Sequence, residues 1–268
     1  MKNIKKFLQM KKHQEPIVMV TAYDYPSGKY AEASGIDLIL TGDSLGMVIL
    51  GYPDTLQVTL DDMIHHTKAT RRGAPDTFII ADMPHMSYHV SIENTRYNAG
   101  KLFKEGLANA VKLEGGKPSR LEAIRAIVDC EIPVCAHLGL TPQSINTMGG
   151  YKVQGKEEAD YQAILQQALA IEDAGAFMLV LEGIPEKLGK EITAKLSIPT
   201  IGIGAGRYTD GQVLVFHDIL GMCDFKPKFV KQYANLKEEI VNHLSTWKTE
   251  VKEGKFPDRE NVYIPLEK

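Results

Sequence analysis

The sequence predicts a (β/α)8 barrel, a TIM barrel, in which eight parallel strands alternate with helices. Three observations indicate this fold: eight short apolar runs bounded by turn residues, helix-like segments between most of them, and a length of 268 residues. Strands this rich in Val, Ile and Leu are typical of a parallel sheet buried on both faces. The runs are IVMVTAYD from Ile17, LILTGD from Leu38, FIIADMP from Phe78, AVKLEG from Ala110, PVCAHLG from Pro133, FMLVLEG from Phe177, PTIGIGAG from Pro199 and GQVLVFHD from Gly211.

Side-chain alternation within these runs defines an inward face for each strand. In AVKLE, Ala110, Lys112 and Glu114 share one face, opposite Val111 and Leu113. In FMLVLE, the same rule places Glu182 on the face of Met178 and Val180. We expect the faces that carry Lys112, Glu114 and Glu182 to point into the barrel.

Two of the intervening segments carry helix-start signals. The stretch TLDDMIHHTKATRRG opens at Thr59 with a Thr-x-x-Asp capping pattern and closes on Gly73. The stretch from Ser91 has a Ser cap and runs through LFKEGLAN. Repeated strand–helix–strand units favour a parallel sheet with right-handed crossovers.

A long amphipathic stretch follows the last strand and predicts a helix with one apolar face. The apolar face is expected to cover either the barrel of its own chain or another subunit. No linker or low-complexity region divides the chain, so we expect a single domain, residues 1–268, with a helical extension from about residue 226. The apolar positions are Val230, Tyr233, Leu236, Ile240, Leu244, Trp247 and Val251.

Composition limits the classes of partner. The net charge of −3 offers no polycationic surface for nucleic acid or anionic lipid. No apolar run of signal-peptide length follows the basic start, and no window approaches a membrane-spanning helix. The three cysteines, Cys130, Cys135 and Cys223, are an odd number, which argues against a disulfide framework and favours the cytoplasm.

Five consecutive apolar runs each lead to a polar side chain capable of chemistry. The C-terminal ends of barrel strands converge on one rim, where the active sites of such barrels lie. Carboxylates gathered without thiolates suit a hard cation such as Mg²⁺. The sequence therefore predicts a metal-assisted acid/base site. The five residues are Asp43, Asp82, Glu114, His137 and Glu182.

Three carboxylates are candidates for the metal. Asp43 and Asp82 are short and follow strands, which favours them as direct ligands, and the longer Glu114 reaches the ion directly or through water. Each alone could equally be a helix N-cap, and Asp43 with Ser44 could cap the turn that follows. Their convergence on adjacent strands favours the metal site.

Lys112, His137 and Glu182 complete the predicted set. A buried Lys112 requires an anionic partner, which could be a substrate carboxylate or a structural ion pair with Glu114 or Asp82. His137 could be structural or catalytic. Glu182 lies across the mouth from the second and third strands, which favours a general base over a metal ligand. The late GIGAG run from Gly202 is weak support for nucleotide binding, because another strand-like run follows it.

Long blocks of the chain resemble the ketopantoate hydroxymethyltransferase family. The blocks follow the family's order from about Val18 to about Gly221, whereas the first dozen residues and the C-terminal tail are neutral. They are VTAYDYPSGKYAE, LILTGDSLGMVILGYPDTLQVTLDDM, ADMPHMSY, VKLEGG, HLGLTPQS, GGYKVQGK, LVLEGIP and IGIGAGRYTDGQVLVFHDILG. Two departures fall on the pocket wall: His85 stands where Phe is more frequent, and Cys135-Ala136 where Met-Gly is common.

The resemblance implies a barrel of the phosphoenolpyruvate/pyruvate superfamily. It also implies transfer of a hydroxymethyl group from 5,10-methylenetetrahydrofolate to 3-methyl-2-oxobutanoate, giving 2-dehydropantoate in pantothenate and coenzyme A biosynthesis. By the same resemblance Mg²⁺ is expected on Asp43 and Asp82, with Glu114 completing the site. Ser44 and Lys112, together with Asp43 and Asp82, are then keto-acid-binding residues.

The resemblance further implies that Glu182 is the proton acceptor and that the chain forms a homo-oligomer, in this family commonly a decamer. His137 is a candidate for a supporting role toward folate or water. Two alternatives remain open at this point. One is a folate-independent, Mg²⁺-dependent carbon–carbon lyase acting on a 2-oxo acid, and the other is a catalytically silent barrel that binds a metabolite.

Overall fold

A computed structural model describes residues 1–224 and 226–263 of the chain. It divides into two compact units, residues 1–216 and residues 217–268. Each unit is described by itself below. The predicted single domain, whose last five residues lie outside the described part, stays a prediction.

The first unit is built on a closed barrel of parallel strands, which confirms the predicted fold. The strands pair in chain order, and β1 closes the barrel by pairing with β8. All eight lie within the apolar runs singled out in the sequence. They are β1 (Ile17–Thr21), β2 (Leu38–Thr41), β3 (Phe78–Asp82), β4 (Ala110–Glu114), β5 (Val134–Gly139), β6 (Met178–Glu182), β7 (Thr200–Ile203) and β8 (Gly211–Leu214).

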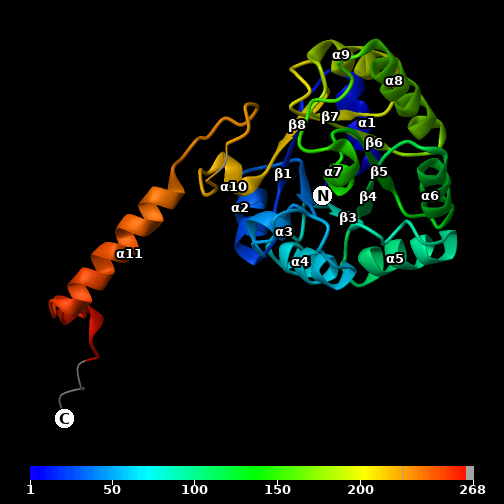
Figure 1. Ribbon diagram of the computed structural model, residues 1–268. Helices are drawn as coiled ribbons and strands as arrows, with labels where there is room; N and C mark the ends of the chain where they lie inside the picture. The colour runs from blue at the N-terminus through cyan, green and yellow to red at the C-terminus, as the bar shows by residue number, and fades with distance from the viewer. Residues whose placement is uncertain (225, 264–268) are drawn as a thin grey trace. The chain divides into compact units, whose positions relative to one another are not determined.

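Helices surround this barrel, as Figure 1 shows. The predicted caps are confirmed: Thr59 and Asp62 form a reciprocal capping box at the start of α4, and the Ser91 hydroxyl accepts the Asn94 N–H at the start of α5. The helices of the first unit are α1 (Ile4–Lys12), α2 (Tyr25–Ala33), α3 (Leu45–Val48), α4 (Leu60–Gly73), α5 (Ile92–Lys104), α6 (Pro118–Asp129), η1 (Pro142–Ser144), α7 (Ile145–Met148), α8 (Glu158–Asp173) and α9 (Glu186–Lys195).

Alternation along the strands separates two apolar clusters. In β4, Val111 and Leu113 belong to the cluster between strands and helices, whereas Ala110 belongs to the cluster that fills the barrel. In β6, Met178 and Val180 likewise lie in the inner cluster. The inward face predicted for the chemistry-bearing residues is therefore the face that points into the barrel.

Helix α1 closes the N-terminal end of the barrel, an element that sequence reasoning did not predict. Its buried Phe7 and Met10 join the inner cluster. The Phe7 ring meets Phe78 edge-on with centroids 5.4 Å apart, and Phe78 meets Phe177 at 6.0 Å. Three aromatic rings thus seal the end of the barrel opposite to the predicted site.

The second unit contains α10 (Phe216–Ile219, whose first residue belongs to the first unit), α11 (Leu236–Lys252) and η2 (Arg259–Asn261). The predicted amphipathic helix is thus shorter than expected, because Val230 and Tyr233 precede it. No residue of α11 is buried, and its apolar stripe, which includes Leu244 and Trp247, is exposed. Within the described residues, no helix is both long and apolar enough to cross a membrane.

Candidate active site at the C-terminal end of the barrel

Strand register brings the predicted residues together at one rim. Asp82 on β3 is paired with Lys112 on β4, and Glu114 at the end of β4 is paired with His137 on β5. Strand β5 continues two residues beyond His137, so this histidine lies within the strand and not at its end. Glu182 at the end of β6 pairs with Gly139 and therefore lies nearer the mouth than His137.

Asp43 lies two residues beyond β2 and is tied to Asp82. Its backbone N–H donates to Asp82 Oδ2 at 3.0 Å, and the other oxygen, Asp82 Oδ1, lies 2.7 Å from Lys112 Nζ. All three side chains are at most 4% exposed. A Cβ on residue 42 would lie 3.0 Å from Ser44 Oγ, so Gly42 leaves room for this hydroxyl beside Asp43.

Ser44 is the N-cap residue of α3, but its side chain makes no capping hydrogen bond. Its Oγ instead lies 2.8 Å from the Tyr23 hydroxyl. The alternative in which Ser44 serves as a side-chain cap is therefore wrong, and the hydroxyl belongs to the rim beside Asp43.

Lys112, His137 and Glu182 form a chain of contacts across the mouth. Lys112 Nζ lies 3.4 Å from His137 Nδ1, and His137 Nε2 lies 3.3 Å from Glu182 Oε2. Because an ammonium group only donates, Nδ1 accepts and the ring proton belongs on Nε2. Burial and the Lys112 charge lower the pKa of His137, which keeps the ring neutral.

Carboxyl groups outnumber ammonium groups in this buried cluster. Burial, reinforced by Asp82, raises the pKa of Asp43 to about 7, and burial also raises the pKa of Glu114 well above its usual range. Burial alone would lower the pKa of Lys112, but Asp82, Glu114 and Asp43 outweigh it and raise that pKa. One ammonium group thus lies among three buried carboxyl groups, and Asp43 and Glu114 favour their protonated forms unless further positive charge is supplied.

A hard divalent cation fits this donor set by charge and by ligand type, since all three candidate ligands present carboxylate oxygens. The side chains are not gathered in advance: in the described part of the chain, no three or more His, Cys, Asp or Glu form a ready metal cluster. Several of the oxygens are engaged by protein donors instead. The residues that donate to these oxygens are therefore also part of the candidate metal site.

Sequence reasoning missed Gln143 and Tyr88 as members of this site. Gln143 Nε2 donates to Asp43 Oδ2 at 2.7 Å, and its backbone N–H donates to Glu114 Oε2 at 3.1 Å. The Tyr88 hydroxyl donates to Gln143 Oε1 and accepts the Glu114 N–H at 3.3 Å. The only sequence signals were their places in HLGLTPQS and ADMPHMSY, both of which follow barrel strands.

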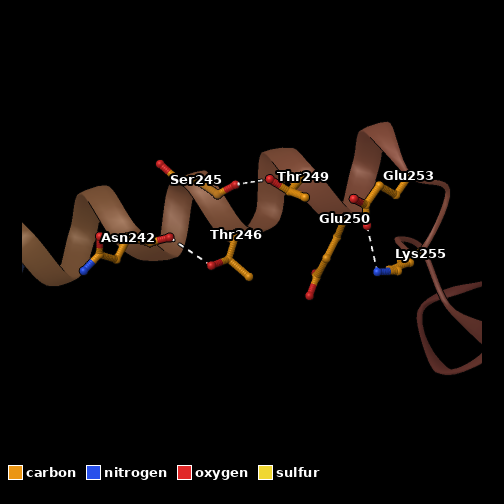
Figure 2. A pocket seen from close by; sticks show the side chains of 7 residues that line it. All are labelled: Asn242, Ser245, Thr246, Thr249, Glu250, Glu253 and Lys255. Atoms are coloured by element: carbon orange, nitrogen blue, oxygen red, sulfur yellow. Dashed lines mark hydrogen bonds and ion pairs between the residues drawn. The ribbon is translucent and has the colours of Figure 1, made fainter.

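A depression along α11 offers no comparable chemistry (Figure 2). Its hydroxyls serve the helix itself: Thr246 donates to the Asn242 carbonyl at 3.0 Å and Thr249 to the Ser245 carbonyl at 2.9 Å. None of the side chains that line it is buried. The barrel mouth is therefore the candidate active site.

Fold and site together define a (β/α)8-barrel enzyme with a buried carboxylate, lysine and histidine cluster at its C-terminal mouth. The family model described as ketopantoate hydroxymethyltransferase matches residues 1–259. The chain belongs to this family of transferases, which confirms the resemblance seen in the sequence.

Curated relatives agree with this assignment. The chain is 56% identical over 259 residues to a 3-methyl-2-oxobutanoate hydroxymethyltransferase of Clostridium kluyveri, covering 96% of this chain and 92% of the relative. It is 57% identical to the Thermosipho africanus protein of the same name, covering 97% of each.

Solved structures with a similar fold are much more distant in sequence. A 2,3-dimethylmalate lyase of the PEP mutase/isocitrate lyase superfamily is 17% identical, with a TM-score of 0.62, covering 97% of this chain and 91% of that one. A phosphonopyruvate hydrolase is 11% identical, with a TM-score of 0.64, covering 99% and 92%. These likenesses show the fold alone, and they agree with the predicted (β/α)8 barrel.

Proposed function

We propose that this chain transfers a hydroxymethyl group from 5,10-methylenetetrahydrofolate to 3-methyl-2-oxobutanoate, giving 2-dehydropantoate for pantothenate and coenzyme A biosynthesis. The observation that carries the proposal is the mouth cluster. Asp43, Asp82, Lys112, Glu114 and Glu182 are all present, and the first four are buried within the barrel of a ketopantoate hydroxymethyltransferase family member.

Mg²⁺ is the proposed cofactor. Asp43 and Asp82 would hold it, with Glu114 completing the site, because these are the buried oxygen donors that need a counter-charge. A bound Mg²⁺ supplies Lewis-acid polarisation of the keto group and stabilises negative charge that develops on its oxygen.

The chain's own residues bind and orient the keto acid. Lys112 holds a positive charge within 2.7 Å of Asp82 and offsets the negative charge of the substrate carboxylate. The Ser44 hydroxyl, held by Tyr23, adds a hydrogen bond at the same rim. The surrounding burial strengthens these electrostatic interactions, because little water screens them.

Glu182 is the proposed general base. It removes the C3 proton of 3-methyl-2-oxobutanoate, and the enolate carbon then forms a bond to the methylene carbon of the folate iminium form. Hydrolysis of the adduct releases the hydroxymethyl product and tetrahydrofolate. Neutral His137 places its Nε2 3.3 Å from Glu182 Oε2, so we infer that His137 supports this carboxylate.

Proton NMR of 3-methyl-2-oxobutanoate in D₂O tests the proposal. With protein and Mg²⁺ we expect the C3 proton signal to disappear, and with added methylenetetrahydrofolate we expect new hydroxymethyl resonances. Exchange without product would favour a folate-independent carbon–carbon lyase. Binding of the keto acid with neither exchange nor product would favour a catalytically silent barrel.

We further propose that the enzyme works in the cytoplasm as a homo-oligomer, in keeping with the decamers common in the family. The free cysteines Cys130, Cys135 and Cys223 support a reducing compartment. The exposed apolar stripe on α11 supports a subunit contact, because apolar surface of this kind is typically covered by a partner. Analytical ultracentrifugation of the full chain, compared with a variant carrying Trp247→Ser and Leu244→Ser, would test the contact.

A further inference from the structure

Gln143 is the most heavily engaged polar side chain at the mouth. It is 5% exposed and lies in η1, the turn that follows β5. Nε2 donates to Asp43 Oδ2 at 2.7 Å and to the Met83 carbonyl at 3.0 Å, and Oε1 accepts the Tyr88 hydroxyl proton. One side chain thereby joins the segments that follow β2, β3 and β5.

The orientation of this amide is fixed by its partners. The Asp43 carboxylate and the Met83 carbonyl are acceptors, so the NH₂ group must face them. The opposite end then meets the Tyr88 hydroxyl, which can donate to it. The buried amide therefore has hydrogen-bond partners at both Nε2 and Oε1, and a flip of the amide would lose them.

The turn that carries Gln143 is itself anchored to β6. The Leu140 N–H donates to the Glu182 carbonyl at 2.8 Å, and Gly139 has a φ of 95°. A Cβ on Gly139 would lie 2.1 Å from the Glu182 carbonyl oxygen, so only glycine permits this close approach. The same backbone segment that supports the proposed base thus also supports Gln143.

Gln143 holds two of the three carboxylates that we propose as metal ligands. The side-chain NH₂ group donates to Asp43 Oδ2, and the backbone N–H donates to Glu114 Oε2. Once both groups are ionised around a cation they repel each other, and a donor on one oxygen of each offsets that repulsion and restricts the orientation of the carboxylate. The two donors thereby restrict the positions from which both carboxylates can approach a metal ion.

We propose that Gln143 is a positioning residue for the metal site and that Tyr88 fixes its amide. The inference rests on the proposed function, because it assumes that Asp43 and Glu114 bind the cation. Its consequence is specific: loss of the amide weakens cation binding, and saturating cation restores the rate. A residue that merely stabilised the fold would not produce this separation.

The test uses the full chain and measures free Mn²⁺ by electron paramagnetic resonance during titration. Gln143→Met removes the donor and acceptor with little change in volume, and we expect it to weaken Mn²⁺ binding by about 10–100-fold. Tyr88→Phe keeps the ring and removes only the hydroxyl, and we expect a smaller weakening. Gln154→Met changes the same residue type in the same β5–α8 connection, where the Gln154 side chain donates to the Lys152 carbonyl, and should bind as the parent does.

A second readout separates positioning from chemistry. At saturating Mg²⁺, C3 exchange by Gln143→Met should return to within about threefold of the parent, with a raised activating concentration. Parental Mn²⁺ affinity in folded Gln143→Met overturns the inference, and so does a rate that stays low at saturating metal. Should Gln143→Met not fold, parental affinity in Tyr88→Phe overturns it instead. If the parent itself bound no Mn²⁺, the proposed metal function would fail, which is a distinguishable result.

Discussion

The same strands bury apolar side chains at the N-terminal end of the barrel and charged side chains at the C-terminal end. At the N-terminal end, Phe7, Phe78 and Phe177 meet edge to face and bury apolar area. At the C-terminal end, Asp82 and Lys112 are equally buried but charged. Burial stabilises the first set and opposes the second, because desolvation penalises ionised groups.

The boundary between the two regions lies within single strands. On β5, Cys135 belongs to the inner apolar cluster, and two residues further His137 belongs to the mouth. On β4, Ala110 likewise belongs to the inner apolar cluster and Lys112, two residues further, belongs to the mouth. Stability is therefore expected to depend mainly on one end and activity on the other, even though the strands are shared.

The largest effect is expected from Asp82→Asn. The amide has no negative charge to balance Lys112 and is a weaker cation ligand than a carboxylate, so C3 exchange should fall at least about 10⁴-fold, combining lost electrostatic and positioning contributions. The protein should still fold, because Asp43 and Glu114 remain near Lys112. Exchange measured by NMR and folding by circular dichroism check this. Asp61→Asn on the exposed surface of α4 is the control and should change neither.

Glu182→Gln should have the next largest effect. Removal of a general base lowers the exchange rate by about 10³-fold, within the usual range for such groups. Mn²⁺ affinity should stay close to that of the parent, because Glu182 is not a proposed ligand. Glu122→Gln, on an exposed position of α6, provides the matched control. Parental exchange in Glu182→Gln would remove this residue from the base role.

Phe78→Ala tests the opposite end. Loss of a buried ring that touches both Phe7 and Phe177 should lower the free energy of unfolding by about 3–5 kcal/mol, measured by urea titration. The exchange rate per folded molecule should not change, because the site lies at the other end. Phe103→Ala, at a partly exposed position of α5, should cost about 1 kcal/mol or less. A large loss of specific activity in Phe78→Ala would show that packing at the N-terminal end also determines activity.

Strand positions and inward faces could be predicted from the sequence because both depend on local pattern. Apolar runs bounded by turns identified the eight strands, and period-two alternation placed Lys112 and Glu114 inside. The rim convergence of Asp43 and Asp82 followed from the fold class alone, since parallel strands end on one side.

Gln143 and helix α1 could not be predicted in this way. Gln143 acts through contacts to Asp43 and to Glu114, which come from distant parts of the chain and carry no local signature. Phe7 and Met10 sit in a short basic segment whose partners lie at the N-terminal ends of several strands. In both cases tertiary packing assigns the role, and no periodicity within the segment reports it.

The smallest expected effect concerns the Cys135 thiol, which lies at the boundary between the two regions. Burial raises the pKa of Cys135 to about 12, so at pH 8 in the folded parent Ellman's reagent should modify the exposed Cys130 and leave Cys135 unmodified. Cys135 should react only when the structure around it opens, so its modification rate should follow the stability of the fold and not catalytic activity.

Phe78→Ala should then accelerate Cys135 modification by at least about 100-fold, because each 1.4 kcal/mol changes the population of the open state tenfold. Glu182→Gln should leave that rate near the parental value, with Cys130 as the internal standard in every sample. Equal acceleration by both variants, read by mass spectrometry of the labelled peptides, would show that the two ends open together and that stability and activity do not depend on separate ends of the barrel.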